Sequence, residues 1–119
     1  MLDDLKLLKT MSAMASHAAR RHEVLAQNIA NADTPGYRAK DVQSFADAFQ
    51  EAARTGKDVH QIASAARLVE TGGAMSPNGN SVSLEDQMLR SAEAKGQHDM
   101  ALAVYKKSLD LMRLSLGRK

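Results

Sequence analysis

The sequence contains no cysteine, no tryptophan and only two prolines among its 119 residues. Without cysteine, a disulfide scaffold, a thiolate metal site and a Cys–His catalytic pair are all impossible. This absence is typical of a chain kept in a reducing compartment. Aromatic residues make up only 3% of the chain, so its core has few large aromatic anchors. What remains is one ordinary folded domain, since domains usually run roughly 100–200 residues.

Neither a strong excess of one charge nor a long apolar run is present. Sixteen Lys and Arg against fourteen Asp and Glu leave a net charge of +2, which argues against a protein that depends on phosphate contacts. No stretch approaches the roughly 18 apolar residues of a membrane span, so we expect no direct membrane insertion. Asp3 and Asp4 stand where a secretory signal has its basic start, so we expect no cleavable signal peptide. By these rules alone, the chain looks cytosolic.

A long amphipathic helix is predicted over residues 2–31, with no Pro or Gly before Pro35. Apolar and small residues recur there in steps of three and four, which places them on one face of a helix. The larger residues predicted to form this helix seam are Leu8, Met11, Leu25 and Ile29. Alanine replaces larger residues in the middle of the seam, so another helix can approach closely there but buries little area.

The composition changes abruptly where this helix should end. Asn and Asp prefer caps and turns, and Thr34 is pushed out of the helical region by the proline that follows it. Pro35 and Gly36 suit the two central positions of a type II turn, because Pro presets the first and Gly accepts a positive φ at the second. We expect a locked turn here, formed by Asn28, Asn31, Thr34, Pro35, Gly36 and Tyr37.

The middle of the chain has weaker patterns. Residues 37–42 show no helical stripe and can be extended, whereas residues 44–54 place apolar residues on one helical face. Asp58 with Gln61 resembles a capping pattern, so a second short helix is possible before Thr71–Gly73 ends it. The two glycines, a proline and an Asn-Gly pair that follow indicate a loop up to Asn80.

A second long helix is predicted over residues 83–119. Ser83 suits its N-cap, and acidic residues follow in the first turn. Its predicted seam is polar in the middle and apolar toward the C-terminal end, where it comprises Leu102, Tyr105, Leu109 and Met112. The fold class is therefore all-α: two long terminal helices packed as a coiled-coil-like pair, with a short irregular middle that has room for one or two short helices.

We expect a single domain over residues 1–119, divided into the first helix (1–31), a turn, extended and loop region (32–82) and the second helix (83–119). The direction of the pair, antiparallel or parallel, stays open. Because the seams are thin, apolar surface should remain for neighbouring molecules.

No catalytic constellation is visible. The four histidines are scattered, and His17 and His22 are five residues apart, which is the wrong spacing for two metal ligands on one helix face. No Ser stands in a nucleophile-elbow context, and Gly72–Gly73 lacks the spacing of a phosphate loop. We therefore expect no catalytic residues, no metal and no cofactor. Arg20–Arg21 and the basic C-terminal turns could contact nucleic acid, but a solvated face explains them as well and no aromatics are interleaved.

Two stretches carry a resemblance. The first is Asn-Ile-Ala-Asn-Ala-Asp-Thr-Pro-Gly-Tyr over residues 28–37, followed by Arg38, Lys40, Asp41 and Phe45. The second is Asn-Ser-Val-Ser-Leu-Glu over residues 80–85. Both are similar to the ends of the long helices in the bacterial flagellar basal-body rod protein family, and the Thr-Pro-Gly-Tyr version resembles its proximal-rod members. The chain departs from that pattern at Ser83, where an acidic residue is usual, and residues 43–78 match nothing in it.

The resemblance implies a structural subunit without enzymatic activity or cofactor. It also implies that the turn fixes the segment after it for contact with a neighbouring subunit. It implies export by the flagellar type III system, which reverses the cytosolic inference, and assembly into the rod of the basal body in the periplasm. The implied partners are copies of the chain itself, the rod proteins FlgC and FlgF, the adaptor FliE, and the export gate and MS ring. A small cytosolic helical adaptor or export chaperone is the main alternative. A nucleic-acid binder and an enzyme are further alternatives, although we expect no nucleic-acid partner.

Overall fold

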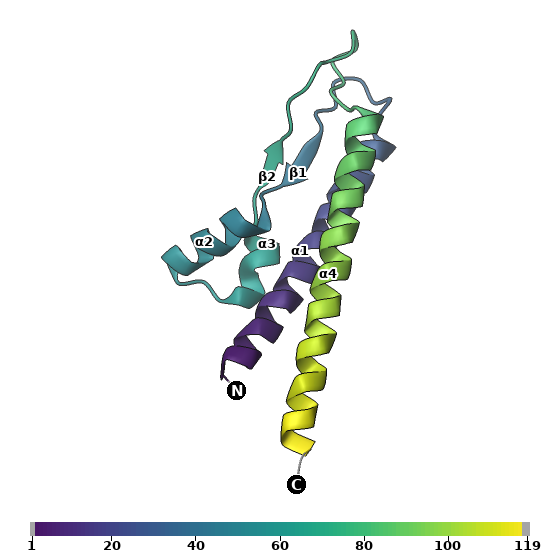
Figure 1. Ribbon diagram of the computed structural model, residues 1–119. Helices are drawn as coiled ribbons and strands as arrows, with labels where there is room; N and C mark the ends of the chain where they lie inside the picture. Colours follow the sequence, from purple (N-terminus) through teal and green to yellow (C-terminus); the bar gives the residue numbers. More distant parts are fainter. Residues whose placement is uncertain (1, 118–119) are drawn as a thin grey trace.

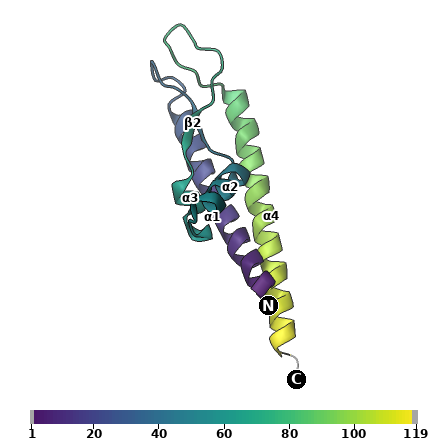
Figure 2. The ribbon, with the colours of Figure 1, turned by 90° about the vertical axis from the view of Figure 1, so that its left-hand side faces the viewer.

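Two long helices dominate the computed structural model, which describes residues 2–117. Helix α1 (Leu2–Ala30) and helix α4 (Leu84–Gly117) lie side by side in a molecule of 68 × 28 × 15 Å. Both chain ends lie at the same end of the molecule and the connecting loops at the other, so the pair is antiparallel (Figures 1 and 2). The predicted all-α fold with two packed terminal helices is confirmed. The relative direction of the two helices, which the sequence left open, is antiparallel. The predicted last residues of the second helix, 118 and 119, lie outside the described residues.

The end of α1 is built by the turn that the sequence predicts. The N–H of Asn31 donates to the carbonyl of Gln27, and the N–H of Thr34 then donates to the carbonyl of Asn31, both at 3.1 Å. Gly36 has φ +75°, and the N–H of Tyr37 donates to the carbonyl of Thr34 at 3.2 Å. A positive φ at the residue after proline is what a type II turn requires, so this turn is formed as expected.

The middle segment contains two short α-helices and a small sheet. Strand β1 (Lys40–Val42) is followed by α2 (Phe45–Thr55), the 3₁₀ turn η1 (Val59–Gln61), α3 (Ile62–Ala65) and strand β2 (Leu68–Glu70). Local signals start and stop these helices. The hydroxyl of Ser44 accepts from the N–H of Asp47, Gly56 ends α2 at φ +76°, and Asp58 forms the capping box with Gln61.

The second short helix is shorter than the sequence pattern predicts. Ala66 is extended (φ −61°, ψ 132°), so α3 ends at Ala65 instead of continuing toward Thr71. The chain turns extended because its backbone pairs with β1: the N–H of Gln43 donates to the carbonyl of Arg67, and the N–H of Thr71 donates to the carbonyl of Ala39. The β1–β2 sheet is antiparallel, with Asp41 opposite Val69.

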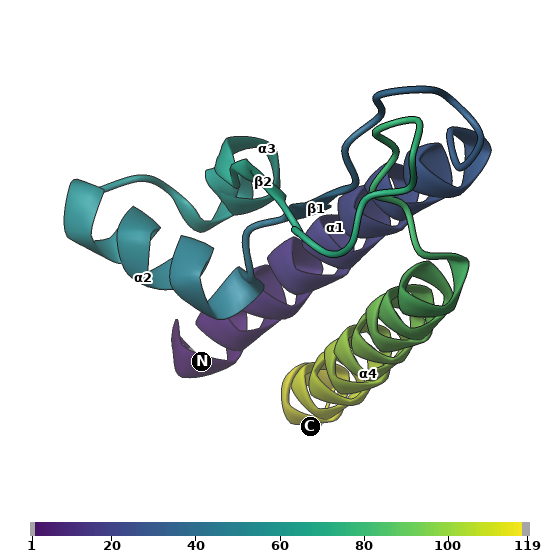
Figure 3. The same cartoon turned by 90° about the horizontal axis from the view of Figure 1, so that it is seen from above.

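The apolar core lies between α1 and the middle segment, not between the two long helices. Figure 3 shows α2, α3 and the two strands on one side of α1, with α4 on another. The buried cluster joins residues of α1 to residues of β1, α2 and α3, and comprises Ala13, Val24, Val42, Phe45, Ala48, Ala52, Ile62 and Ala66. The short middle segment is therefore the part of the chain that supplies α1 with an apolar core.

The contact between α1 and α4 uses smaller residues than expected. The buried residues of α4 recur every seven positions and are Gln87, Ala94, Ala101 and Ser108. Two predicted seam residues, Ile29 and Leu102, are instead 40% and 42% exposed. Small side chains let two helices approach closely, which moves the larger side chains to the flanks of the contact. Leu8 and Leu25 are buried, whereas Met11, Tyr105, Leu109 and Met112 are half-buried.

Candidate functional site

The loop end of the helix pair holds a cluster of polar side chains, here called the loop-end cluster: the buried Asn28, Asn80, Ser81 and Gln87 and the half-buried Tyr37. Asn28 and Gln87 have no exposed surface, and Asn80 is 2% exposed. They come from the end of α1, from the segments on both sides of the loops, and from the first turn of α4. A buried polar group is costly unless it is hydrogen-bonded, so the bonds of this cluster decide its role.

Asn28 makes four hydrogen bonds. Its Nδ2 donates to the carbonyl of Lys40 at 2.6 Å and to Oε1 of Gln87 at 2.9 Å. Its Oδ1 accepts from the hydroxyl of Tyr37 and from the N–H of Lys40, both at 3.1 Å. The carboxamide thus joins α1, the segment after the turn, and α4. Its polar atoms are used within the chain, so Asn28 fixes the fold.

Asn80 closes the cluster from the other side. Its Nδ2 donates to the carbonyls of Asn31 and Thr34 at 2.8 and 2.7 Å, and its Oδ1 accepts from the N–H of Val82 at 2.8 Å. The neighbouring hydroxyl of Ser81 accepts from the N–H of Ala39 at 2.8 Å. The second sequence motif (residues 80–85) therefore fixes the turn that belongs to the first motif (residues 28–37), although the bonded residues lie about fifty positions apart in the chain.

The tip of the turn is exposed. Thr34, Pro35 and Gly36 all lie on the surface, and the hydroxyl of Thr34 donates to Oδ1 of the half-buried Asn31 at 3.0 Å. Gly36 also donates its N–H to the carbonyl of Asn78 at 2.9 Å, so the second loop braces the first. The predicted turn residues thus divide into an internal part and an exposed, rigidly held tip.

A second polar network surrounds Asp41, and it was not predicted. Arg21 of α1 donates to both carboxylate oxygens at 3.0–3.2 Å, and Arg90 of α4 donates to Oδ2 at 2.8 Å. Arg90 also donates to Asp86 at 2.8 Å. Burial raises the pKa of Asp41, but the hydrogen bonds from Arg21 and Arg90 outweigh burial and hold the pKa below its ordinary value. This charged carboxylate links α1, β1 and α4.

Two further side chains of α1 hold the middle segment. Nε2 of the buried His17 donates to the carbonyl of Gln43 at 2.6 Å, and the ring packs edge-on against Phe45. Burial lowers the pKa of His17 and outweighs the hydrogen bond to Gln43, which raises it; the charges of Arg21 and Arg20 act in the same direction as burial. Arg20 donates to the carbonyls of Ala63 and Ala66 at 2.6 Å each, which caps the end of α3. Arg20 and Arg21, considered as nucleic-acid contacts in the sequence, therefore serve the fold.

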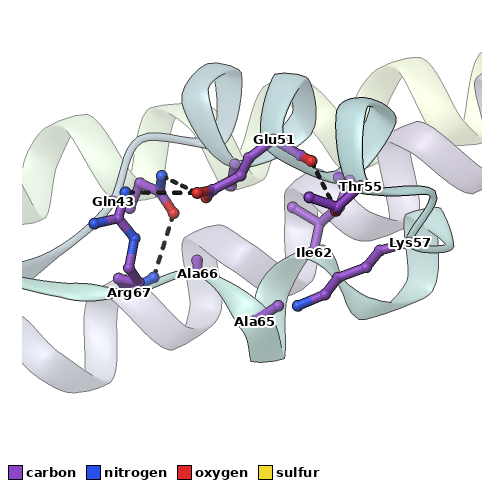
Figure 4. A pocket seen from close by; sticks show the side chains of 10 residues that line it. Gln43, Glu51, Thr55, Lys57, Ile62, Ala65, Ala66 and Arg67 are labelled. Atoms are coloured by element: carbon purple, nitrogen blue, oxygen red, sulfur yellow. Dashed lines mark hydrogen bonds and ion pairs between the residues drawn. The ribbon is translucent and has the colours of Figure 1, made fainter.

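The cavities carry no catalytic arrangement. A hollow of about 230 Å³ lies between α2 and α3. Figure 4 shows the side chains that line it, among them Ile62, Ala65 and Ala66. At its edge, Gln43 donates to Glu51 at 3.0 Å, and Arg67 lies 3.8 Å from the same carboxylate. A larger groove of about 810 Å³ runs between the sheet and α4, lined by side chains of mixed charge. No group of three metal-ligating side chains occurs among residues 2–117, and no helix there is long and apolar enough to cross a membrane.

Helix α4 carries more than half of the large apolar side chains that are exposed among the described residues. Large side chains with more than half of their surface exposed are spread around this helix: Leu84, Met88, Leu89, Met100, Leu111, Leu114 and Leu116. A helix that is apolar on several sides is normally covered on several sides, but α1 covers only one of them. The exposed faces of α4 are therefore candidate contacts for other chains.

Sequence reasoning missed the residues that act through distant partners. His17, Arg21, Asn80 and Gln87 face groups that the linear pattern does not bring together, and Asp41 entered only as one letter of a motif. Polar residues at positions where a helix seam should be apolar, such as His17 and Gln87, are the signal that could have drawn attention to them.

Comparisons with known proteins agree on one family. Residues 7–38 match the family model for flagella basal body rod proteins. The chain is 32% identical to the flagellar basal body rod protein FlgB of Agrobacterium fabrum, over 98% of this chain and 97% of that protein. It is 50% identical to FlgB of Escherichia coli over 37% of this chain and 31% of that protein. It is 56% identical to FlgB of Aeromonas hydrophila over 29% of this chain and 25% of that protein.

Proposed function

The chain belongs to the FlgB family of flagellar basal body rod proteins, and we propose from this that it builds the proximal part of the rod, at its base. Members of this family are structural rod proteins and not enzymes, so the chain is a structural subunit of the basal body rod. The observation that carries the proposal is the similarity to the Agrobacterium FlgB over nearly the whole of both chains. A small cytosolic adaptor or export chaperone is not favoured.

The partners and the route of the subunit are part of the proposal. We propose that the chain is exported by the flagellar type III system, and that it joins the rod in the periplasm. There it contacts copies of itself, FlgC and FlgF above it, and FliE, the export gate and the MS ring below it. The support is the family membership together with the exposed apolar side chains of α4, which a neighbouring chain could cover.

Two surfaces are proposed as contacts between subunits. The first is the exposed face of α4 toward its C-terminal end, including Leu111, Leu114 and Leu116, which stands free of α1. The second is the turn tip at Thr34–Gly36, which the loop-end cluster holds rigidly. We further propose that the whole chain acts as one rod-core domain, because the middle segment is bound to α1 by the apolar core and by His17, Arg20 and Arg21.

Purification of basal bodies from a strain with a tagged chromosomal copy tests the proposal. A rod subunit co-purifies with basal bodies, and a cryo-electron-microscopy map shows its helix pair at the base of the rod. Deletion of the gene abolishes motility, and the wild-type copy restores it. An adaptor or chaperone stays in the cytosolic fraction, and that result would overturn the proposal.

A further inference from the structure

The small sheet has one strand edge without a partner. In an antiparallel pair, every second residue exchanges hydrogen bonds with the partner strand and the residues between them point their N–H and C=O groups outward. The bonds at Arg67–Gln43 and Thr71–Ala39 set this alternation, so Val69 bonds inward to Asp41. The N–H and C=O groups of Leu68 and Glu70 therefore point away from β1.

Nothing in the described part of the chain covers this outer edge of β2. Leu68 and Val69 are 49% and 42% exposed, and Glu70 is exposed as well. Figure 1 places β2 on the side of β1 that faces away from α4, and Figure 3 shows the same open side from above. Among residues 2–117, no hydrogen bond is found to the backbone of Leu68 or Glu70 apart from any within the β1–β2 pair. Two apolar side chains therefore flank four unpaired backbone groups.

The chemistry of the edge defines what can bind there. Alternating N–H and C=O groups at strand spacing are matched by the backbone of another extended chain, which adds itself to the sheet. The exposed Leu68 and Val69 offer apolar contact on the two faces of such a strand. The side chain of Arg67 is 66% exposed and meets only the carboxylate of Glu51, at 3.8 Å, among the described residues, so it can also pair with an acidic side chain.

We propose that the outer edge of β2 binds an extended segment of a neighbouring rod subunit, which forms a third strand beside Leu68 and Glu70. The segment carries apolar side chains toward Leu68 and Val69 and an acidic residue near Arg67. This inference rests on the proposed function. A rod grows by contacts that repeat from one subunit to the next and do not close into a ring or a two-fold pair. A pairing of β2 with β2 of a second copy is two-fold and closes, so it cannot continue along a rod. The three-residue length of β2 also limits uncontrolled pairing of free monomers.

Replacement of Glu70 by proline tests the edge directly. The N–H of Glu70 points outward, so Glu70→Pro removes a donor of the outer edge and leaves the bonds between β1 and β2 in place; proline is tolerated at such positions. Glu70→Ala is the matched control, because it removes the same side chain and keeps the N–H. Circular dichroism of the purified variants checks that both fold. We expect Glu70→Pro to reduce the amount of the chain in purified basal bodies by roughly tenfold, while Glu70→Ala stays near wild type.

Equal incorporation of the two variants would overturn the inference, whereas absence of the wild-type chain from basal bodies would overturn the proposed function instead. A purified wild-type dimer that Glu70→Pro converts to monomer would indicate self-pairing and would also count against it. If Glu70→Pro does not fold, amide hydrogen exchange of the wild-type chain decides. The amides of Leu68 and Glu70 should exchange quickly in the free monomer and at least about 100-fold more slowly in the assembled rod. Unchanged exchange of these two amides would contradict the third strand.

Discussion

The two ends of the α1–α4 pair are built on different physical principles. At the loop end, Asn28, Asp41 and Asn80 are buried and hydrogen-bonded to partners from several elements. Toward the chain ends, the contact is made by Ala101 and Ser108 on α4, while Leu114 and Leu116 face solvent. Directional bonds define one geometry at the loop end. Small apolar contacts at the other end hold the helices together but leave most of the apolar surface of α4 unused.

The difference shows how one short chain can be folded and still keep apolar side chains exposed for assembly. Buried polar groups need partners within the chain, and the side-chain polar atoms of Asn28, Asp41 and Asn80 find them in the monomer, whereas Nε2 of Gln87 is buried without a partner among the described residues. Exposed leucines gain free energy only when another surface removes them from water. The free end of α4 can therefore serve assembly without weakening the part of the fold that positions it. The following changes would break or sharpen this contrast.

The largest effect on stability is expected for Asp41→Ala at the loop end. The change leaves Arg21 and Arg90 without their buried carboxylate, and the free energy of unfolding should fall by about 3 kcal/mol. Urea denaturation measures this value. Asp110→Ala, at an exposed position of α4, is the control and should change it by less than about 0.5 kcal/mol. Similar losses for the two variants would show that the Asp41 network does not hold the loop end.

Asn28→Ala should lower the free energy of unfolding by about 2 kcal/mol, which is the second largest effect. The change leaves the backbone of Lys40, the hydroxyl of Tyr37 and the amide oxygen of Gln87 without their partner. Tyr37→Phe is a graded comparison, since it removes only one of these bonds. Thermal unfolding of both variants shows which of the two changes destabilises the fold more. A loss for Asn28→Ala no larger than that for Tyr37→Phe would mean that the cluster is not cooperative.

Gly36→Val should cost about 1–2 kcal/mol, because a β-branched residue is strained at a φ of +75°. A Cβ at this position meets nothing within 4 Å, so the cost comes from the backbone and not from a clash. Gly36→Asn is the control, since Asn tolerates a positive φ. If the turn tip contacts a neighbour, Gly36→Val also reduces swimming in soft agar more than Gly36→Asn does. Normal motility of the Gly36→Val strain would exclude that role.

Acid should weaken the fold gradually. The folded pKa of His17 and of Asp41 lies below the ordinary values of 6.5 and 3.8, so the unfolded chain binds more protons and stability falls as the pH falls. The loss of stability due to His17 begins near pH 6.5 and continues down to its folded pKa, and the loss due to Asp41 begins near pH 3.8. Unfolding by urea at a series of pH values measures this slope. His17→Gln should reduce the slope of the free energy of unfolding against pH in the range just below pH 6.5. An unchanged slope there would show that His17 does not cause this pH dependence.

The smallest effect on the monomer is expected for Leu114→Ser at the free end. Its side chain is already 62% exposed, so the free energy of unfolding should change by less than about 0.5 kcal/mol. Incorporation into basal bodies should nevertheless fall, because the proposed contact loses an apolar side chain. Leu114→Met, which keeps the apolar volume, should assemble normally. Equal assembly of the two variants would remove this face of α4 from the proposed interface.

Much of the architecture could be predicted from local patterns. The long apolar stripes indicate α1 and α4, the Pro-Gly pair predicts the turn at Gly36, and Ser44 and Asp58 predict the starts of α2 and η1. These signals depend on residues close together in the chain, so they act the same way in any context. Strand β2 had no such signal, because its pairing with β1 depends on a segment almost thirty positions away.

The sequence by itself determined the elements of this protein: two long helices, a rigid turn after the first, and too little aromatic and large apolar content for a thick core. Only the tertiary structure decided how these elements use their side chains. It placed the apolar core between α1 and the middle segment, selected a small-residue contact for α4, and brought Arg21 and Arg90 onto Asp41. The reason is physical: helix and turn propensities act over a few neighbouring residues, whereas burial and ion pairing depend on which distant groups meet once the chain has folded.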